Sequence, residues 1–255
     1  MIELKNITFS YTSKPFIKDV CARFEDGGIT AIIGENGSGK STLLKLISGE
    51  EKPQAGSVFV DGRDMSTLKR KDAAKLLSNF PQGREIPDMN SLELVSLGRY
   101  PYLSLSPVTP KEEENIALSA LRYVGAERFA FVDLKKMSYG ERQRVYLAMQ
   151  IAQGSHNMLL DEPTSFLDIG AQFEVMNILT SLRNEGKCIV CILHDIPLAM
   201  RCADNIILMK NGNIIAKGRP GELHEGGMIE EAFGISLERI ELGDSTSFVP
   251  MPKKL

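Results

Sequence analysis

The chain has 255 residues, of which 43% are hydrophobic, and its 30 basic and 33 acidic residues leave a formal net charge of −3. This composition supplies an ordinary hydrophobic core, so it excludes disorder as the default state. The near-neutral charge argues against a surface coated with basic residues for broad binding of nucleic acid. The length fits one large domain or a core with an inserted lobe.

The sequence starts with MIELKNITFS, which has neither a basic segment followed by an apolar stretch nor a transit-peptide composition. The apolar run from Cys188 to Leu193 is far shorter than the roughly 20 residues of a membrane-spanning helix. We therefore expect that a membrane function would need another chain to provide the span. The four cysteines fit a reducing compartment, and we interpret Cys188 and Cys191 as buried strand residues rather than a metal or redox site.

The first sixty residues predict short strands separated by glycine and aspartate, a pattern typical of hairpins. We therefore expect an antiparallel sheet in this part of the chain. After Lys40 the apolar residues follow a helical stripe that ends at Gly49. The predicted strands cover residues 2–9, 19–24, 29–33 and 57–60.

Between residues 87 and 153 strand patterns nearly vanish and helical periodicity dominates. We interpret this segment as a helical subdomain inserted into a core made of residues 1–86 and 154–255. The helices are predicted over residues 91–97, 112–124 and 141–153.

Strands and helices alternate after residue 153, which predicts a parallel sheet with helical crossovers. A hairpin is expected around Asn211 and Gly212. The tail from about Gly221 is weakly patterned. The predicted strands are 157–161, 187–193, 206–210 and 213–217, and the predicted helices are 169–179, a short one from Ile196, and 230–235 in the tail.

A phosphate-binding loop is the strongest local motif. Residues 34–41 (GENGSGKS) match G-x-x-x-x-G-K-[ST] at every fixed position and lie between an apolar strand and a helix. The glycines let backbone N–H groups surround phosphate oxygens, and the helix N-terminus adds its positive end. In a phosphate site Lys40 would neutralise phosphate oxygens and Ser41 would ligate Mg²⁺, whereas a glycine-rich turn that binds nothing would need neither residue. The predicted phosphate-binding residues are Gly34, Asn36, Gly37, Ser38, Gly39, Lys40, Ser41 and Thr42.

An acidic pair follows a second apolar strand. Residues 158–160 lead straight into Asp161 and Glu162, at the carboxyl edge of the predicted sheet, where ligands of α/β proteins bind. We predict that Asp161 holds Mg²⁺ through a water molecule and that Glu162 polarises the attacking water. Two acids after a strand are common, and by themselves they would favour a solvated strand end. The phosphate loop favours the catalytic interpretation.

Residues 137–143 (MSYGERQ), shortly before that strand, resemble the signature of ATP-binding-cassette (ABC) ATPases. Further motifs follow in the family's order: Tyr11, Gln82, residues 165–168 (SFLD) and His194 followed by Asp195. The resemblance covers essentially the whole chain. It implies an α/β fold, with a P-loop NTPase core, an antiparallel β subdomain and an inserted helical subdomain.

The resemblance also implies catalytic roles. Tyr11 would stack on adenine, a contact that a flat aromatic ring can make. Gln82 would reach the Mg²⁺ or the attacking water, at the joint between the core and the helical subdomain. His194 would contact the γ-phosphate and orient Glu162. Alone, Tyr11 and His194 would be interpreted as structural residues at strand ends.

The signature implies a homodimer in which two copies sandwich two ATP molecules. Ser138 and Gly140 begin a helix whose donors suit an anion, which in the family is the γ-phosphate of ATP bound to the opposite copy. Glu141 and Asp168 are predicted nucleotide contacts on the same grounds. Tyr139 departs from the family, which has a glycine-like residue there. Its ring could crowd the phosphate or pack away from it, and we expect slower or more partner-dependent hydrolysis than in a glycine version.

Residues 97–102 (LGRYPY) resemble a segment of importers for iron-siderophore complexes, haem and cobalamin, and residues 165–172 have the same character. The resemblance implies ATP-driven uptake of a metal chelate, most specifically a ferric siderophore, with ATP and Mg²⁺ as cofactors. The chain would lie peripherally at the cytoplasmic face of the cell (inner) membrane. Its partners would be transmembrane permease subunits and, indirectly, a substrate-binding protein, but no nucleic acid.

Three other functions stay open at this stage. A haem or cobalamin importer fits the same segment, because this subunit does not touch the cargo. A non-transport ABC ATPase, acting as a nucleotide-switched scaffold, would use the same motifs. A plain P-loop kinase fits less well, because it leaves residues 137–143 unexplained.

Overall fold

The computed structural model describes residues 1–80, 86–103, 109–242 and 245–253. Its centre is a six-stranded sheet, in which the last two strands along the chain pair antiparallel and all other neighbours are parallel. In spatial order the strands are β10 (Asn213–Gly218), β9 (Asn205–Lys210), β3 (Gly28–Gly34), β8 (Cys188–Ile192), β7 (Asn157–Asp161) and β6 (Leu77–Phe80). This confirms the predicted parallel sheet and the hairpin at Asn211 and Gly212.

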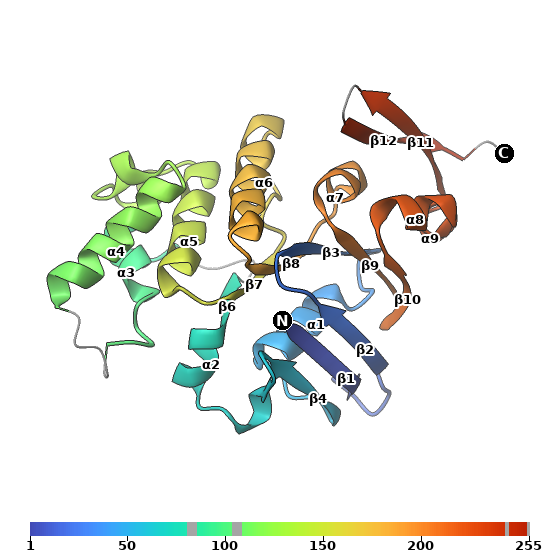
Figure 1. The fold of residues 1–255 in the computed structure, drawn as a ribbon, viewed down its shortest axis with the longest axis horizontal. Coiled ribbons are helices and arrows are strands. Elements are labelled where there is room, and N and C mark those ends of the chain that lie inside the picture. Colours follow the sequence, from blue (N-terminus) through green and yellow to red (C-terminus); the bar gives the residue numbers. More distant parts are fainter. Residues whose placement is uncertain (81–85, 104–108, 243–244, 254–255) are drawn as a thin grey trace.

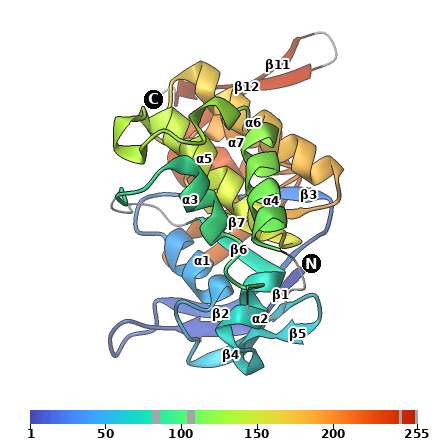
Figure 2. The same cartoon turned by 90° about the vertical axis from the view of Figure 1, so that its left-hand side faces the viewer.

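A second, antiparallel sheet lies beside the first (Figures 1 and 2). Its order is β2 (Ile17–Phe24), β1 (Ile2–Phe9), β4 (Ala55–Val60) and β5 (Arg63–Asp64). The expected antiparallel sheet is confirmed, but the predicted strand 29–33 belongs to the central sheet as β3. Because β3 is buried on both faces, it has the near-continuous apolar sequence typical of a central parallel strand.

Two hydrophobic clusters cover the two faces of the central sheet. Helix α1 (Lys40–Ser48) packs between this sheet and the antiparallel sheet, where Ile32 meets Leu43 and Ile47. The opposite face carries Ala31 and Ile33 and is covered by α6 (Ile169–Asn184) and α7 (Ile196–Cys202). Neighbouring strand residues point to opposite faces, so one short apolar strand serves both clusters.

Helices α3 (Ser91–Leu97), α4 (Pro110–Tyr123) and α5 (Tyr139–Gln153) pack against one another at one end of the molecule (Figure 1, left). Each begins with a reciprocal cap, in which Asn90, Thr109 or Ser138 bonds with the glutamate three positions later. The helices predicted here are confirmed. The short 3₁₀ helices are Met65–Thr67, Glu127–Phe129 and Leu134–Lys136.

Several elements were not predicted: α2 (Arg70–Leu76), β6, α8 (Pro220–Glu225) and a C-terminal hairpin of β11 (Ile235–Leu242) and β12 (Ser245–Pro252). The predicted helix 230–235 is α9 (Met228–Phe233). It ends earlier than expected because Gly234 adopts a left-handed conformation with φ 65°. Figure 1 shows the hairpin at the opposite end of the molecule from α3 and α4.

Cys188 and Cys191 are free and buried on β8, as predicted, and they pack into opposite clusters because they are three residues apart on a strand. Burial raises the pKa of each thiol to about 12. No helix within residues 1–80, 86–103, 109–242 or 245–253 is long and apolar enough to cross a membrane.

Candidate nucleotide-binding site

The phosphate loop connects β3 to α1, as the motif requires. Gly34 has no room for a side chain, since a Cβ there would lie 2.3 Å from the carbonyl oxygen of Met209. Gly39 begins α1 with φ 105°, and a Cβ there would lie 2.9 Å from Cδ1 of Ile17. Asn36 and Gly37 form the exposed tip of the loop. The two packed glycines let the backbone itself form the inner surface of the loop.

The start of α1 has the properties of an anion site. The residue at the N-cap of this helix is Gly39, which has no side chain to cap it, and the first turn contains no acidic residue. Its N-terminal N–H groups are therefore available to an anion in the loop. Ser38 is buried, and its hydroxyl has no hydrogen-bond partner in the described structure. A buried polar atom of this kind is costly unless a ligand satisfies it. The loop therefore fits phosphate oxygens.

Lys40 is 5% exposed, and its Nζ donates to the carbonyl oxygens of Gly34 at 2.8 Å and Glu35 at 3.0 Å. Burial lowers the pKa of Lys40, while the charges of Glu162 and Asp161 act in the opposite direction. The Lys40 ammonium therefore lies inside the loop, where phosphate oxygens of a bound triphosphate could replace these carbonyl oxygens as its hydrogen-bond acceptors.

Asp161 ends β7 and meets the phosphate loop because β7, β8 and β3 are neighbours in one sheet. The hydroxyl of Ser41 donates to Oδ1 of Asp161 at 3.4 Å. Burial raises the pKa of the Asp161 carboxyl, and the charge of Glu162 adds to this rise. A hydroxyl beside a carboxylate is a donor set that suits Mg²⁺.

Among the described residues, Ser165 and His194 contact the Glu162 carboxylate. Oγ of Ser165 donates to its Oε2 at 2.9 Å, and Nε2 of His194 shares a hydrogen bond with its Oε1. The backbone of Glu162 has φ 54°, which is rare for a residue other than glycine and common at functional sites. The predicted pairing of His194 with Glu162 is thus present in the structure, although the roles of both residues in hydrolysis stay predictions.

Tyr11 lies beside the same helix. Its hydroxyl is 3.3 Å from Oγ1 of Thr42, its ring is 56% exposed, and one edge contacts Phe9 at a centroid distance of 4.8 Å. An exposed ring anchored next to α1 can stack on a base whose phosphates occupy the loop. Gln82, the remaining catalytic residue predicted, lies outside the described residues.

The other predicted nucleotide contacts form a separate cluster. Ser138, Gly140 and Glu141, at the start of α5, line a groove of about 360 Å³ together with Asp168. Asp168 caps α6, and its Oδ1 accepts from the N–H of Ala171 at 2.8 Å. Figures 1 and 2 show α5 beside α6. These residues are therefore close to one another and belong to elements other than the phosphate loop.

Within this cluster, Glu141 binds its own chain. Its carboxylate accepts from the N–H of Ser138 at 2.8 Å, and Oγ of Ser138 accepts from the N–H of Glu141 at 3.3 Å. The bond from the Ser138 backbone is the main reason that the pKa of Glu141 is lowered. A hydroxyl that accepts one hydrogen bond still has its own hydrogen to donate, so Ser138 can serve the cap and an anion together.

Sequence reasoning missed Ser165 as a site residue, although it was noted within the motif at 165–168. Its hydroxyl reaches Glu162 only because the chain reverses direction between them, and the N–H of Ser165 donates to the carbonyl oxygen of Glu162 at 3.2 Å. The sequence does offer one indication of this contact: Ser165 follows Glu162 by three positions, and a turn brings residues at that spacing together.

The phosphate loop and the acidic pair at the sheet edge define a P-loop nucleotide-binding site. A family model described as "ABC transporter" matches residues 17–165. The chain is 36% identical to a petrobactin import ATP-binding protein of Bacillus anthracis over 91% of this chain and 86% of the relative. It is 35% identical to the ferric enterobactin transport ATP-binding protein of Escherichia coli (strain K12), with the same two coverages.

Solved structures similar to this chain are also ATP-binding cassettes or transporters that contain them. A dimeric ATP-binding cassette bound to ADP and Pi in a post-hydrolysis state has a TM-score of 0.77 and 29% identity, and the match covers 86% of this chain and 99% of the other. A transporter assigned to the metal-chelate type has a TM-score of 0.84 and 25% identity, covering 99% and 98%. The chain belongs to the ABC transporter family and is one of its ATP-binding, ATP-hydrolysing subunits.

Proposed function

We propose that this chain powers the import of a ferric siderophore through a separate membrane permease. The observation that carries the proposal is the uncapped start of α1 at the phosphate loop, with Asp161 and Glu162 beside it. The cargo is supported by similar proteins named for petrobactin, ferric enterobactin and, at 34% identity in Bacillus subtilis, iron(3+)-hydroxamate. These names favour a siderophore over haem or cobalamin.

Mg²⁺ would be held by Ser41 and Asp161, whose side chains already meet across the loop. The bound ion would supply charge neutralisation on the β- and γ-phosphate oxygens. Gln82 is a third ligand in this proposal. Because the pKa of Asp161 is raised by burial, its carboxylate benefits more from a cation than an exposed aspartate would.

In the proposed hydrolysis, Lys40 neutralises the phosphates and Glu162 accepts the proton of the attacking water. His194 holds Glu162 in place through their shared hydrogen bond. Phosphoryl transfer depends mainly on positioning and charge stabilisation, which these side chains supply together with the backbone of the loop.

We further propose that two copies of the chain share each site. Ser138 and Gly140 offer hydroxyl and backbone donors at the start of α5, and Asp168, which caps α6, lines the same groove. These donors would complete the γ-phosphate site of the opposite copy. In this arrangement a single copy binds ATP but lacks half of the groups around the γ-phosphate.

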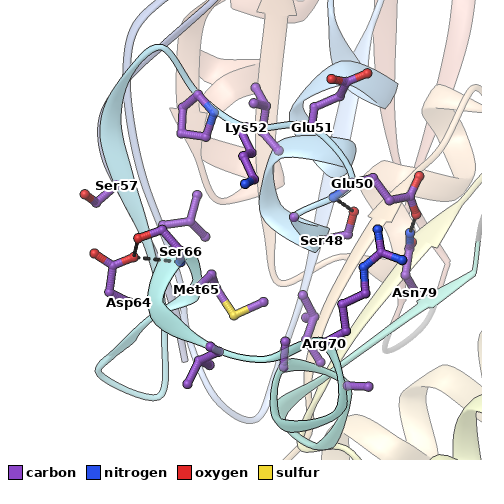
Figure 3. Close-up of a pocket in the computed structure, with 18 of the residues that line it drawn as sticks. Ser48, Glu50, Glu51, Lys52, Ser57, Asp64, Met65, Ser66, Arg70 and Asn79 are labelled. Carbon is purple, nitrogen blue, oxygen red and sulfur yellow. Dashed lines mark hydrogen bonds between the residues drawn. The ribbon is translucent and has the colours of Figure 1, made fainter.

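The permease would bind where the helical subdomain, residues 87–153, meets the core. On the core side of this junction lies a cavity of about 1020 Å³, lined by the end of α1, the following loop, β4, α2 and β6, together with Gln153 at the end of α5 (Figure 3). Figure 3 shows Asp64 and Ser66 on one side of it and Glu50, Arg70 and Asn79 on the other. The cavity lies beside β6, the strand that leads toward Gln82.

An exposed apolar patch adjoins this cavity. Leu97, Tyr100 and Leu103 are 53%, 61% and 60% exposed. The ammonium of Lys71, on α2, lies 5.0 Å from the ring centre of Tyr100, so the helix that lines the cavity also borders the patch. Exposed apolar side chains gathered beside a cavity are typical of a protein–protein contact. A permease that contacts both the cavity on the core and the apolar patch on the helical subdomain could transmit movement between these two parts of the chain.

This surface can be tested with charge substitutions. Tyr100→Glu should abolish copurification with the permease while leaving the ATPase activity of the isolated chain unchanged. Phe131→Glu is the matched control, because Phe131 is 77% exposed in the same subdomain. Retained copurification of Tyr100→Glu, or equal loss in both variants, would contradict the proposed surface.

The cargo is tested by uptake of ⁵⁵Fe-labelled siderophores in cells that lack the gene. Wild-type protein should restore uptake, whereas Glu162→Gln should not. If uptake of iron chelates is unaffected by the deletion while labelled haem or cobalamin uptake is lost, the cargo is wrong but the transport function holds. ATPase stimulation by DNA or by a soluble partner instead of a permease would favour the scaffold alternative.

A further inference from the structure

The loop between β7 and α6 combines catalytic and strained residues. Glu162 and Phe166 have φ angles of 54° and 62°, a region that side chains other than glycine rarely adopt. Phe166 is also 84% exposed, so its own burial does not fix this conformation. Strained residues persist only where their surroundings hold them in place. The structure must therefore contain contacts that hold this loop.

Part of the loop is held by polar contacts. Oγ of Ser165 donates to Oε2 of Glu162 at 2.9 Å, and Asp168 caps the start of α6. Ser165 precedes Phe166 directly, so the position of the Phe166 backbone sets where the Ser165 hydroxyl lies. The orientation of the Glu162 carboxylate thus depends on the middle of the loop.

The middle of the loop packs against α5 through aromatic rings. Tyr139 and Phe166 meet edge to face, with a centroid distance of 5.9 Å and an interplanar angle of 82°. This geometry is favourable for aromatic pairs. Next to it, Leu167 faces Gly140, where an added Cβ would lie 3.4 Å from Cδ2 of Leu167. The start of α5 and the loop are therefore in direct contact within one chain.

Tyr139 is itself fixed. Nε2 of Gln143, a buried residue one turn further along α5, donates to the Tyr139 hydroxyl at 2.9 Å. The ring therefore lies back along its own helix against Phe166, which decides between the two orientations that the sequence left open. Burial and the charge of Glu162 raise the pKa of the Tyr139 phenol, consistent with a ring near the catalytic carboxylate.

We propose that Tyr139 is a positioning residue for ATP hydrolysis within its own chain: its contact with Phe166 holds Ser165, and through Ser165 the Glu162 carboxylate, in the geometry for activating water. The proposal rests on the proposed role of Glu162. It predicts the opposite of the sequence-based expectation for Tyr139, because replacing the ring should slow hydrolysis rather than accelerate it.

The test is a double-mutant cycle with Tyr139→Leu and Phe166→Leu, measured as kcat and KM for ATP on the full chain over a range of protein concentrations up to saturation. Each single variant should lower kcat about two- to tenfold, the range that an aromatic contact supports, with little change in KM. The double variant should be no slower than the slower single one. Tyr139→Phe, which keeps the ring, should retain most of the wild-type kcat, and Ser165→Ala should reproduce the loss.

Several results would overturn the proposal. Wild-type kcat in Tyr139→Leu, or losses that multiply in the double variant, would show that the rings do not act together. A loss that disappears when protein concentration is raised would show that Phe166 contacts the second copy instead. If Glu162→Gln hydrolyses ATP at the wild-type rate, the proposed function of the site fails, independently of the aromatic pair.

Discussion

Nε2 of His194 shares a hydrogen bond with Oε1 of Glu162, although the two residues follow different strands. They meet because β7 and β8 are parallel neighbours, with Asp161 opposite Ile192 in the register. Parallel strands bring their carboxyl ends to one edge of a sheet, so residues 32 positions apart meet without any local motif. This edge faces the phosphate loop, where the hydroxyl of Ser41 donates to Asp161 at 3.4 Å.

Glu162→Gln should bind ATP normally and hydrolyse it about 10²–10⁴-fold more slowly, because an amide cannot take the proton of the attacking water. Steady-state phosphate release and equilibrium binding of a fluorescent ATP analogue separate the two effects. Glu127→Gln is the matched control, since Glu127 pairs with Arg122 on the exposed surface. Wild-type phosphate release by Glu162→Gln would remove Glu162 from the role of base.

Asp161→Asn should raise the thermal stability of the nucleotide-free protein. The pKa of Asp161 is raised in the folded state, mainly by burial, so its protonated form favours folding. That stability is present below the ordinary value of 3.8 and is lost as pH rises through the higher folded pKa, which leaves the ionised group unfavourable at pH 7. An amide avoids this cost.

Differential scanning fluorimetry at pH 7 checks the Asp161 prediction. The variant should melt higher than wild type without ligand and should lose the further rise that ATP with Mg²⁺ gives the wild type. Asp204→Asn is the control, because Asp204 accepts from the N–H of Ile29 at 2.8 Å and pairs with Arg183 at 3.1 Å. It should melt lower. A lower melting temperature for Asp161→Asn would contradict the account of this carboxyl.

Arg99→Ala should destabilise the fold by about 3–5 kcal/mol, as expected when one partner of a buried ion pair is removed. Nε of Arg99 donates to Glu113 at 2.6 Å, Nη1 donates to the carbonyl oxygen of Ala152 at 2.8 Å, and the two side chains are 12% and 9% exposed. Denaturant unfolding measures the loss. Arg122→Ala, in an exposed pair, should cost no more than about 1 kcal/mol.

The Arg99 result would also clarify the LGRYPY segment. Its arginine joins α3, α4 and α5, which gives it a structural purpose independent of any cargo. Equal stability losses for Arg99→Ala and Arg122→Ala would mean that the pair does not hold the three helices together.

Alkylation by iodoacetamide at pH 8 should modify Cys21 first. Cys21 is exposed, whereas Cys188 and Cys191 are buried with pKa values of about 12, so almost none of their thiolate form is present at pH 8. Mass spectrometry of the native protein should find both buried cysteines unmodified until denaturant is added. Native modification of either one would contradict the close packing of β8.

The phosphate loop and the acidic pair could be predicted because each is defined by local spacing next to a strand. The antiparallel sheet and the helices α3 to α5 were predictable for a similar reason, since periodicity marks their buried faces. Strand β3 was assigned to the wrong sheet because pairing partners are set by the whole fold. Its neighbours β8 and β9 lie far away in the sequence.

The C-terminal hairpin was missed because β12 contains Pro250 and Pro252, which argue against a strand inside a sheet. In a two-stranded ribbon every strand is an edge, and a proline is tolerated there. Ser165 was missed for another reason. The Ser165 side chain reaches Glu162 because the backbone of Glu162 is left-handed. Neither composition nor hydrophobic periodicity predicts that backbone conformation.

The central claim is that two copies share each ATP site, and the specific ATPase activity of the isolated chain as a function of its own concentration tests this most directly. The account predicts that activity per chain rises with concentration and saturates as dimers form in sedimentation experiments. Gly140→Asp, which places a carboxylate in the second cluster, should prevent the rise without weakening ATP binding. A constant activity per chain, down to concentrations at which only single copies sediment, would contradict the account.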